Sequence, residues 1–288
     1  MRSFATSFAL LAGLSLARTE GPATLVQQQW QDILSDYGYN YEEFEVDTDD
    51  GWSLTLFHIL AKEGTTTDKS TLLFQHGNMM DASYWMAYQD QSSQSGDPMF
   101  FQLVDQGYDV WMGNNRGTWF SSNQDYPYAD NPLSSAQYLE QNVLKYDFDF
   151  TEMGVSDLPA MIDKVVEVSQ NDKITYVGFS MGTSQMFYGL TQKEESYFAS
   201  KVEKAIMMAP CVFTTTLGLD NYKQVYPVYR EHNINVINDP NWVYDLQALC
   251  DDHSSAEACA AGRQYSGTQA SVKSLERYEQ MAISGRYQ

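Results

Sequence analysis

The chain contains repeated short runs of apolar, β-branched and aromatic residues, each about as long as a β-strand. The first two runs alternate apolar and polar residues on either side of Asp49-Asp50-Gly51, which is a hairpin turn signal. Most later runs are almost continuously apolar, so we expect the strands that they form to be buried in a sheet. The six predicted strands are Tyr41–Val46, Ser53–Leu60, Thr71–Phe74, Tyr108–Met112, Ile174–Val177 and Val202–Met208.

Helix-compatible stretches separate many of these strands. Apolar residues recur near helical spacing from Thr24 to Asp36, and a second helix is expected from Pro98 to Gln106. A longer helix is expected from Phe150 to Ser169, with Pro159 in its early part. Strands that alternate with helices predict an α/β fold, in which helices cover both faces of a mostly parallel sheet.

The predicted strand Ile174–Val177 leads directly into the sequence Gly178-Phe179-Ser180-Met181-Gly182, which fits G-x-S-x-G. A helix-compatible run then continues to Leu190. A strand, a sharp turn carrying a serine and a helix form the context of a nucleophile elbow, in which glycines make room for a crowded turn. The turn places the serine hydroxyl at a helix N-terminus, where negative charge is favoured. We therefore predict that Ser180 is a catalytic nucleophile, with Gly178 and Gly182 as the elbow glycines, rather than a structural serine.

The third predicted strand ends in Gln75-His76-Gly77-Asn78. A backbone N–H just after such a strand can supply half of an oxyanion hole, and the residue after the nucleophile supplies the other half. The predicted donors are the N–H groups of Asn78 and Met181. His76 could instead be read as a catalytic base, but its place in this loop favours a structural role.

Composition narrows the classes of function. The 288 residues include 17 basic and 38 acidic side chains, which give a formal net charge of −21. Of all residues, 43% are hydrophobic. This charge disfavours binding to nucleic acid or to an anionic membrane surface. It is compatible both with an acidic compartment and with simple solubility. The length allows one large α/β domain or two small ones.

The loop from Gly113 to Trp119 is rich in glycine but lacks the G-x-G-x-x-G pattern of a dinucleotide site. We expect Arg116 to tie this loop together rather than to bind substrate. We expect His58 to lie on the surface of a strand rather than to act in catalysis, because it precedes any nucleophile elbow in the chain. No spacing of cysteine and histidine suggests zinc, so we expect neither a cofactor nor a metal ion.

The first residues have the pattern of a targeting segment. Arg2 precedes a largely apolar stretch from Phe4 to Leu16, and Ser15-Leu16-Ala17 is a small-x-small cleavage pattern. Residues 1–17 therefore predict a secretory signal peptide, which is too short to span a membrane. No other stretch reaches transmembrane length. The signal-like segment itself predicts a protein located outside the cytosol.

Six segments together carry a family resemblance: Trp30–Gly51, Leu72–Gly77, Gly107–Trp119, Phe150–Asp163, Tyr176–Thr183 and Ser271–Gln288. In this order they resemble the acid lipases, the gastric and lysosomal lipases of the α/β-hydrolase fold. The resemblance implies a secreted or lysosomal enzyme that meets neutral lipid esters, triacylglycerol or sterol ester, at an interface. It also implies that Ser180 is the nucleophile and that Asn78 and Met181 are the oxyanion donors. We expect the protein to be a monomer.

The resemblance also suggests how the chain is divided. Residues 18–210 would form the hydrolase core, and residues 211–288 a cap over the site. In this family the triad Asp and His follow the nucleophile and lie beyond the segment that matches Ser271–Gln288. We therefore expect an incomplete core without its C-terminal strands, from a truncated or incomplete gene product. Strand Val202–Met208 would then expose an apolar edge.

Two histidines follow Ser180 within the sequence, and both fall in the predicted cap. They are His232 and His253, and each is an alternative base. The candidate carboxylates of the same region are Asp220, Asp239, Asp245, Asp251 and Asp252.

The chain has three cysteines, and a secreted protein favours pairing two of them. Three pairings exist. Cys211 follows a predicted buried strand, which suggests that it is the unpaired one. The resemblance to the acid lipases supports a disulfide between Cys250 and Cys259.

Three functions remain as alternatives. The first is an acid lipase that works through a serine acyl-enzyme, with an incomplete triad in this sequence. The second is a lipid-binding remnant without catalysis. The third is another secreted serine hydrolase, an esterase or peptidase, which would prefer short soluble substrates to emulsified long-chain esters.

Overall fold

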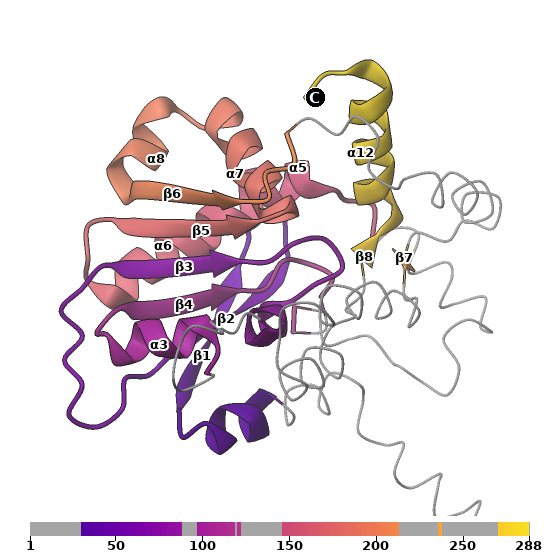
Figure 1. Cartoon of the computed structure of the whole chain (residues 1–288). Helices are drawn as coiled ribbons and strands as arrows, with labels where there is room; N and C mark the ends of the chain where they lie inside the picture. The colour runs from indigo at the N-terminus through magenta and orange to yellow at the C-terminus, as the bar shows by residue number, and fades with distance from the viewer. Residues whose placement is uncertain are drawn as a thin grey trace, which may run out of the picture.

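The computed structural model describes residues 30–87, 97–118, 120–121, 146–212, 236–237 and 270–287. A six-stranded sheet lies at its centre (Figure 1). In spatial order the strands are β1 (Tyr41–Asp47), β2 (Ser53–Ile59), β4 (Asp109–Gly113), β3 (Thr71–Gln75), β5 (Ile174–Phe179) and β6 (Val202–Met208). The pairs β1–β2 and β2–β4 are antiparallel, and the pairs β4–β3, β3–β5 and β5–β6 are parallel. The predicted α/β fold with a mostly parallel sheet is confirmed.

The β1–β2 hairpin turns where the sequence predicted it. The Thr48 N–H donates to the Trp52 carbonyl at 2.8 Å, which closes the turn. Gly51 has a φ of 92°, a conformation that glycine adopts without steric cost. The Asp49-Asp50-Gly51 signal therefore corresponds to a real change of chain direction.

Helices cover both faces of the sheet, as predicted (Figure 1). The helical residues 30–36, the 3₁₀ turn η1 (Ala82–Ala87) and α3 (Met99–Asp105) pack on one face. Their core includes Trp30, Leu34, Phe57, Phe74, Trp85, Phe100 and Phe101. On the other face, α6 (Leu158–Ser169) and α8 (Glu195–Lys201) pack together with part of α7 (Met181–Gln192). This second core includes Leu73, Trp111, Met161, Ile162, Met186 and Phe198.

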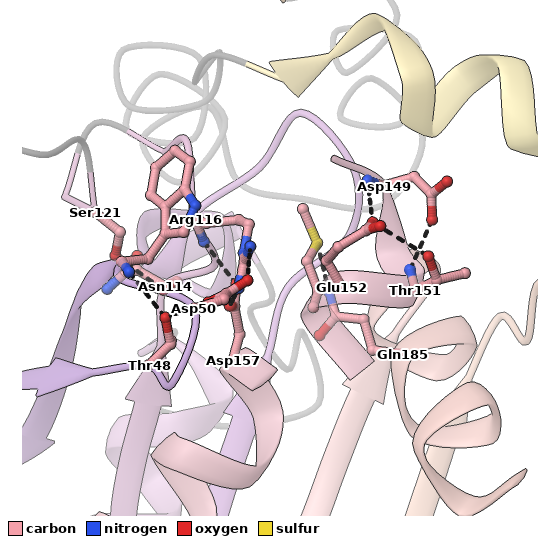
Figure 2. A network of polar contacts seen from close by, with 12 residues as sticks. Thr48, Asp50, Asn114, Arg116, Ser121, Asp149, Thr151, Glu152, Asp157 and Gln185 are labelled. Carbon is pink, nitrogen blue, oxygen red and sulfur yellow. Dashed lines mark hydrogen bonds and ion pairs between the residues drawn. The ribbon is translucent and has the colours of Figure 1, made fainter. Parts of the chain in front are cut away.

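The predicted helix from Phe150 to Ser169 forms in three parts. A short helix α5 (Phe150–Glu152) begins at a capping box formed by Asp149 and Glu152, shown on the right of Figure 2. It continues through the π-helical turn η2 (Met153–Asp157) into α6. The sequence indicated the helix but not its wider turn.

The π-helical turn lies directly against helix α7 (Met181–Gln192). A Cβ on Gly154 would lie 2.6 Å from the Gln185 carbonyl oxygen, and one on Gly189 would lie 2.7 Å from the Gly154 carbonyl oxygen. The two backbones therefore approach as closely as only glycine permits. This close crossing fixes the helix that follows Ser180.

Strand β6 corrects one expectation. The strand was predicted to be buried, but four of its residues, 203 to 206, are exposed, and Ile206 is 49% exposed. The physical reason is position, because β6 pairs only with β5 among the described strands and forms an edge of the sheet. The exposed residues are Glu203, Lys204, Ala205 and Ile206, so this edge is apolar only in part.

The C-terminal part begins with a two-stranded ribbon of β7 (Val236–Ile237) and β8 (Ala270–Ser271). Helix α12 (Val272–Ser284) follows, and Ser271 caps its first turn by accepting the Lys273 N–H. Buried side chains of α12 join a cluster that contains Phe150, Met153, Met181, Tyr278 and Met281. Within the described ranges, no helix has both the length and the apolar character needed to cross a bilayer. The division at residue 211 stays a prediction.

Candidate active site

Ser180 lies in the turn between β5 and α7. Its φ of 50° and ψ of −114° are unusual for a residue with a side chain, a strain that costs about 1–3 kcal/mol. The neighbouring backbone holds the conformation: the Ser180 N–H donates to the Met208 carbonyl at 3.0 Å, and the Ser180 carbonyl accepts from the Thr183 N–H at 2.9 Å. Strain that the fold maintains at one hydroxyl-bearing residue is typical of a functional site.

Both predicted elbow glycines lie in crowded backbone. A Cβ on Gly178 would lie 2.7 Å from the Tyr176 ring and 3.0 Å from the backbone of Gly182. A Cβ on Gly182 would lie 2.6 Å from the Gln75 carbonyl oxygen at the end of β3. The turn can therefore pack against the end of β3 only if both positions lack a side chain.

The loop that follows β3 lies against Ser180. A Cβ on Gly77 would be 3.0 Å from the Ser180 Cβ, so the backbone of this loop touches the turn. Asn78 is bonded to Gly77, and Met181 is the first residue of α7. The structure therefore brings Ser180 and the two predicted oxyanion donors together at the carboxyl ends of β3 and β5.

Polar side chains anchor the far end of this loop. The Ala82 N–H donates to the Asn114 side chain at 2.9 Å, and the Ser83 N–H donates to the Asp81 carboxylate at 2.9 Å. Burial raises the pKa of Asp81 to about 6, although hydrogen bonds from Ser83 oppose this rise. The far end of the loop beside Ser180 is thus held by buried groups.

Cys211 is the residue near Ser180 that the sequence did not reveal. Its Sγ lies 3.6 Å from the Ser180 Oγ. The Cys211 N–H donates to the Thr183 hydroxyl at 3.0 Å, and its carbonyl accepts from the Ser184 hydroxyl at 2.9 Å. Ser184 also contacts the Tyr278 hydroxyl at 3.0 Å, so α12 supports the same place.

Cys211 is a free thiol, as the sequence suggested. Cys250 and Cys259 lie outside the described residues, so their disulfide stays a prediction. The same holds for the five candidate aspartates of the predicted cap. Nothing in the sequence could have paired Cys211 with Ser180, because the contact depends on how the chain returns after β6.

His76 has no ring nitrogen free to act as a base. The side chain is buried, its Nδ1 lies 2.8 Å from the Gly77 carbonyl oxygen, and its Nε2 accepts the Asn115 N–H at 3.1 Å. Burial lowers the pKa of His76 to about 4, while the hydrogen bond to Gly77 opposes that change. These contacts agree with a structural role.

His58 lies at the other end of the strands. Its Nε2 is 2.7 Å from Asp109 at the start of β4, and its Nδ1 is 3.2 Å from Glu42. Ser180 follows the carboxyl end of β5, so His58 does not belong to that site. No histidine or carboxylate in the described ranges hydrogen-bonds the Ser180 Oγ. His232 and His253 lie outside those ranges.

Arg116 ties its loop to two other segments, as expected (Figure 2). Its Nε donates to Asp157 at 2.8 Å, and its two terminal nitrogens donate to Asp50 at 2.6 and 2.9 Å. The side chains of Arg116 and Asp157 are 2% and 0% exposed. Burial raises the pKa of Asp157, and the Arg116 guanidinium opposes that rise. The cluster fixes the β1–β2 turn and the π-helical turn against one loop.

The described residues contain no cluster of three or more histidine, cysteine or acidic side chains arranged to hold a metal ion. What these ranges show at Ser180 is a hydroxyl held in a strained turn, with the Gly77 backbone packed against it.

Family models match most of this architecture. The model described as "alpha/beta hydrolase fold" matches residues 70–235, which is more than half of the chain. The model described as "Partial alpha/beta-hydrolase lipase region" matches residues 30–89. The chain therefore belongs to the α/β-hydrolase fold family.

Curated relatives point to one branch of that family. Lipase member K of Homo sapiens is 33% identical over 183 residues, which cover 62% of this chain and 41% of the relative. Lipase member M of Mus musculus is 34% identical over 186 residues, with 62% and 39% covered. Gastric triacylglycerol lipase of Mus musculus is 33% identical over 181 residues, with 62% and 41% covered. These relatives confirm the resemblance to the acid lipases. The matched region spans about two fifths of their length.

Proposed function

We propose that this protein is a lipase-type ester hydrolase that cleaves triacylglycerol or sterol ester through an acyl-enzyme on Ser180. One observation carries the proposal: the strained Ser180 turn, with φ of 50°, packs against the backbone of Gly77. The relatives named above are lipases, which supports a lipid ester as the substrate class.

The chemistry follows from these groups. The Ser180 Oγ attacks the ester carbonyl, and the N–H groups of Asn78 and Met181 stabilise the negative charge that develops on the carbonyl oxygen. The alcohol leaves, and water then releases the fatty acid from the acyl-enzyme. A base must accept the serine proton, because a neutral hydroxyl is a weak nucleophile. The candidate bases are His232, His253 and a histidine carried by a longer form of the protein.

A lipid-binding role without turnover is the second candidate. The observation that favours it is the neighbour of Ser180, because the hydroxyl contacts the Cys211 thiol rather than an imidazole in the described residues. In that case Ser180 would remain inert, and the protein would only hold an apolar ligand.

The proposed setting is secretion or delivery to an acidic vacuole or lysosome. The signal-like residues 1–17 and the net charge of −21 support this location. The low pKa of His76, about 4, would keep the loop beside Ser180 unchanged at mildly acidic pH.

A covalent probe separates the two candidates. A fluorophosphonate with a long alkyl chain reacts with activated serines and leaves a mass adduct. We expect a slowly formed adduct on the peptide that contains Ser180, because the oxyanion donors leave some reactivity even where the base is absent, and none in Ser180→Ala. An adduct-free peptide from a protein that nevertheless binds a fluorescent fatty acid would favour the lipid-binding role. Faster reaction with a short soluble probe than with the long one would favour another serine esterase.

A further inference from the structure

The hydrogen bonds of His76 define which nitrogen carries its proton. The Asn115 backbone N–H points at Nε2 from 3.1 Å, and a backbone N–H can only donate. Nε2 must therefore be the acceptor, and the proton of the neutral ring lies on Nδ1. Nδ1 then donates to the Gly77 carbonyl oxygen at 2.8 Å.

The Gly77 carbonyl belongs to the same peptide unit as the Asn78 N–H. The described chain contains no cis peptide bond, so the carbonyl and the N–H of this rigid unit point in opposite directions. A hydrogen bond that fixes the carbonyl therefore also fixes the N–H. Gly77 itself touches Ser180, since a Cβ on Gly77 would lie 3.0 Å from the Ser180 Cβ.

We propose that His76 is a positioning residue: its Nδ1–H holds the Gly77 carbonyl and thereby orients the Asn78 N–H toward the oxyanion formed at Ser180. The role given to Asn78 rests on the proposed function. His76 itself touches neither substrate nor Ser180, and it acts through one peptide unit.

The partner on the other side of His76 is itself immobilised. Asn115 precedes Arg116, whose N–H donates to the buried Asp157 carboxylate at 3.0 Å. The Asn115 N–H is therefore a fixed donor, and its hydrogen bond to Nε2 fixes the tautomer of His76. The pKa of His76, near 4, is lowered chiefly by burial, so the ring keeps this single-proton form in a mildly acidic medium.

Two matched substitutions separate positioning from simple packing. In His76→Asn the side-chain amide nitrogen can take the place of Nδ1 and donate to the Gly77 carbonyl. In His76→Gln the amide lies near the place of Nε2, where it can meet the Asn115 N–H but not the Gly77 carbonyl. Both variants lose the ring, but glutamine keeps one methylene more than asparagine, so a packing role alone predicts that His76→Asn is the more disturbed variant.

The test uses two measurements on the full chain. The first is the ¹H–¹⁵N NMR signal of the Asn78 amide, together with the ¹⁵N shifts of the His76 ring. The second is the second-order rate of Ser180 labelling by the fluorophosphonate. We expect the Nδ1 of His76 to be protonated. We expect the Asn78 signal to keep its position in His76→Asn and to shift in His76→Gln. Labelling should be about tenfold slower in His76→Gln, a smaller loss than the factor of about 10²–10³ that follows removal of a whole oxyanion donor.

Equal labelling rates and equal Asn78 signals in the two variants would overturn the proposal, as would a protonated Nε2 in the wild-type protein. If wild-type Ser180 is not labelled at all, the proposed function fails, and the Asn78 signals still decide whether His76 orients that amide. If His76→Gln does not fold, the ring tautomer and the His76→Asn signal decide instead.

Discussion

The thiol of Cys211 lies 3.6 Å from the hydroxyl oxygen of Ser180. An ester carbon must come within about 3–3.5 Å of the Ser180 Oγ to react. A group added to the Cys211 sulfur would lie close to this position and would hinder the ester. Modification of Cys211 would therefore restrict access to the proposed nucleophile.

We expect alkylation of Cys211 with N-ethylmaleimide to slow fluorophosphonate labelling of Ser180 by about tenfold or more, which is about 1.4 kcal/mol in activation free energy. The variant Cys211→Ala serves as the control, because it removes the modified atom and should be labelled at the same rate with or without the reagent. A similar loss in Cys211→Ala would assign the effect to another residue.

The buried cluster of Arg116 and Asp157 should dominate the stability of its region. Arg116→Met leaves the Asp157 carboxylate without its partner, and losing one member of a buried pair costs about 3–5 kcal/mol. Urea unfolding should show this loss. The matched control is Glu167→Gln, which removes a solvent-exposed partner of Lys164 and should cost below about 1 kcal/mol.

A second variant tests whether the loss comes from the unpaired carboxylate. Arg116→Met combined with Asp157→Leu replaces the pair by apolar groups and should recover part of the stability. A double variant less stable than Arg116→Met would contradict the assigned cause.

The His58 cluster predicts a pH dependence of stability. Burial lowers the pKa of His58, but Asp109 and Glu42 outweigh this effect, so the pKa in the folded state is above the ordinary histidine value of about 6.5. Protonated His58 therefore contributes its full stabilisation below about pH 6.5, and this contribution is lost as the pH rises through the folded-state pKa. The difference in unfolding free energy between pH 5.5 and pH 9 should therefore be smaller in His58→Asn than in the wild-type protein. An equal difference in the two proteins would show that His58 does not contribute.

Much of the fold could be predicted from local sequence. Each predicted strand, and each predicted helix whose two ends both lie in the described ranges, forms within a few residues of its expected bounds. The hairpin at Gly51 and the glycine-flanked turn at Ser180 have local signals, because backbone strain needs particular residues.

What the sequence could not give depends on contacts between distant segments. The burial of β6 was wrong because apolar composition does not say which strands pair. Helix α8 (Glu195–Lys201) is short and largely polar, so no periodicity indicated it. The contact between Cys211 and Ser180, and the hydrogen bond from Asn115 to His76, join residues 31 and 39 positions apart.

The predicted disulfide has its own test. Closing a loop of this length by a Cys250–Cys259 bond should contribute about 2–3 kcal/mol on the loop-entropy model. Peptide mapping of secreted protein under non-reducing conditions should recover the two cysteines in one linked peptide. Recovery of Cys211 linked to either of them would contradict both the pairing and the free thiol beside Ser180.

The most direct test of the central claim is a titration of fatty acid released from an emulsified long-chain triacylglycerol at mildly acidic pH. Four proteins are compared: residues 18–288, and the same residues extended by the C-terminal segment of Lipase member K, each with Ser180 or Ser180→Ala. Removing the base from a serine hydrolase costs on the order of 10⁶ in kcat, so we expect little release by the shorter protein. We expect release by the extended protein and none by its Ser180→Ala variant. Fatty acid release that survives Ser180→Ala would contradict the account, whereas Ser180-dependent release by the shorter protein would assign the base to His232 or His253.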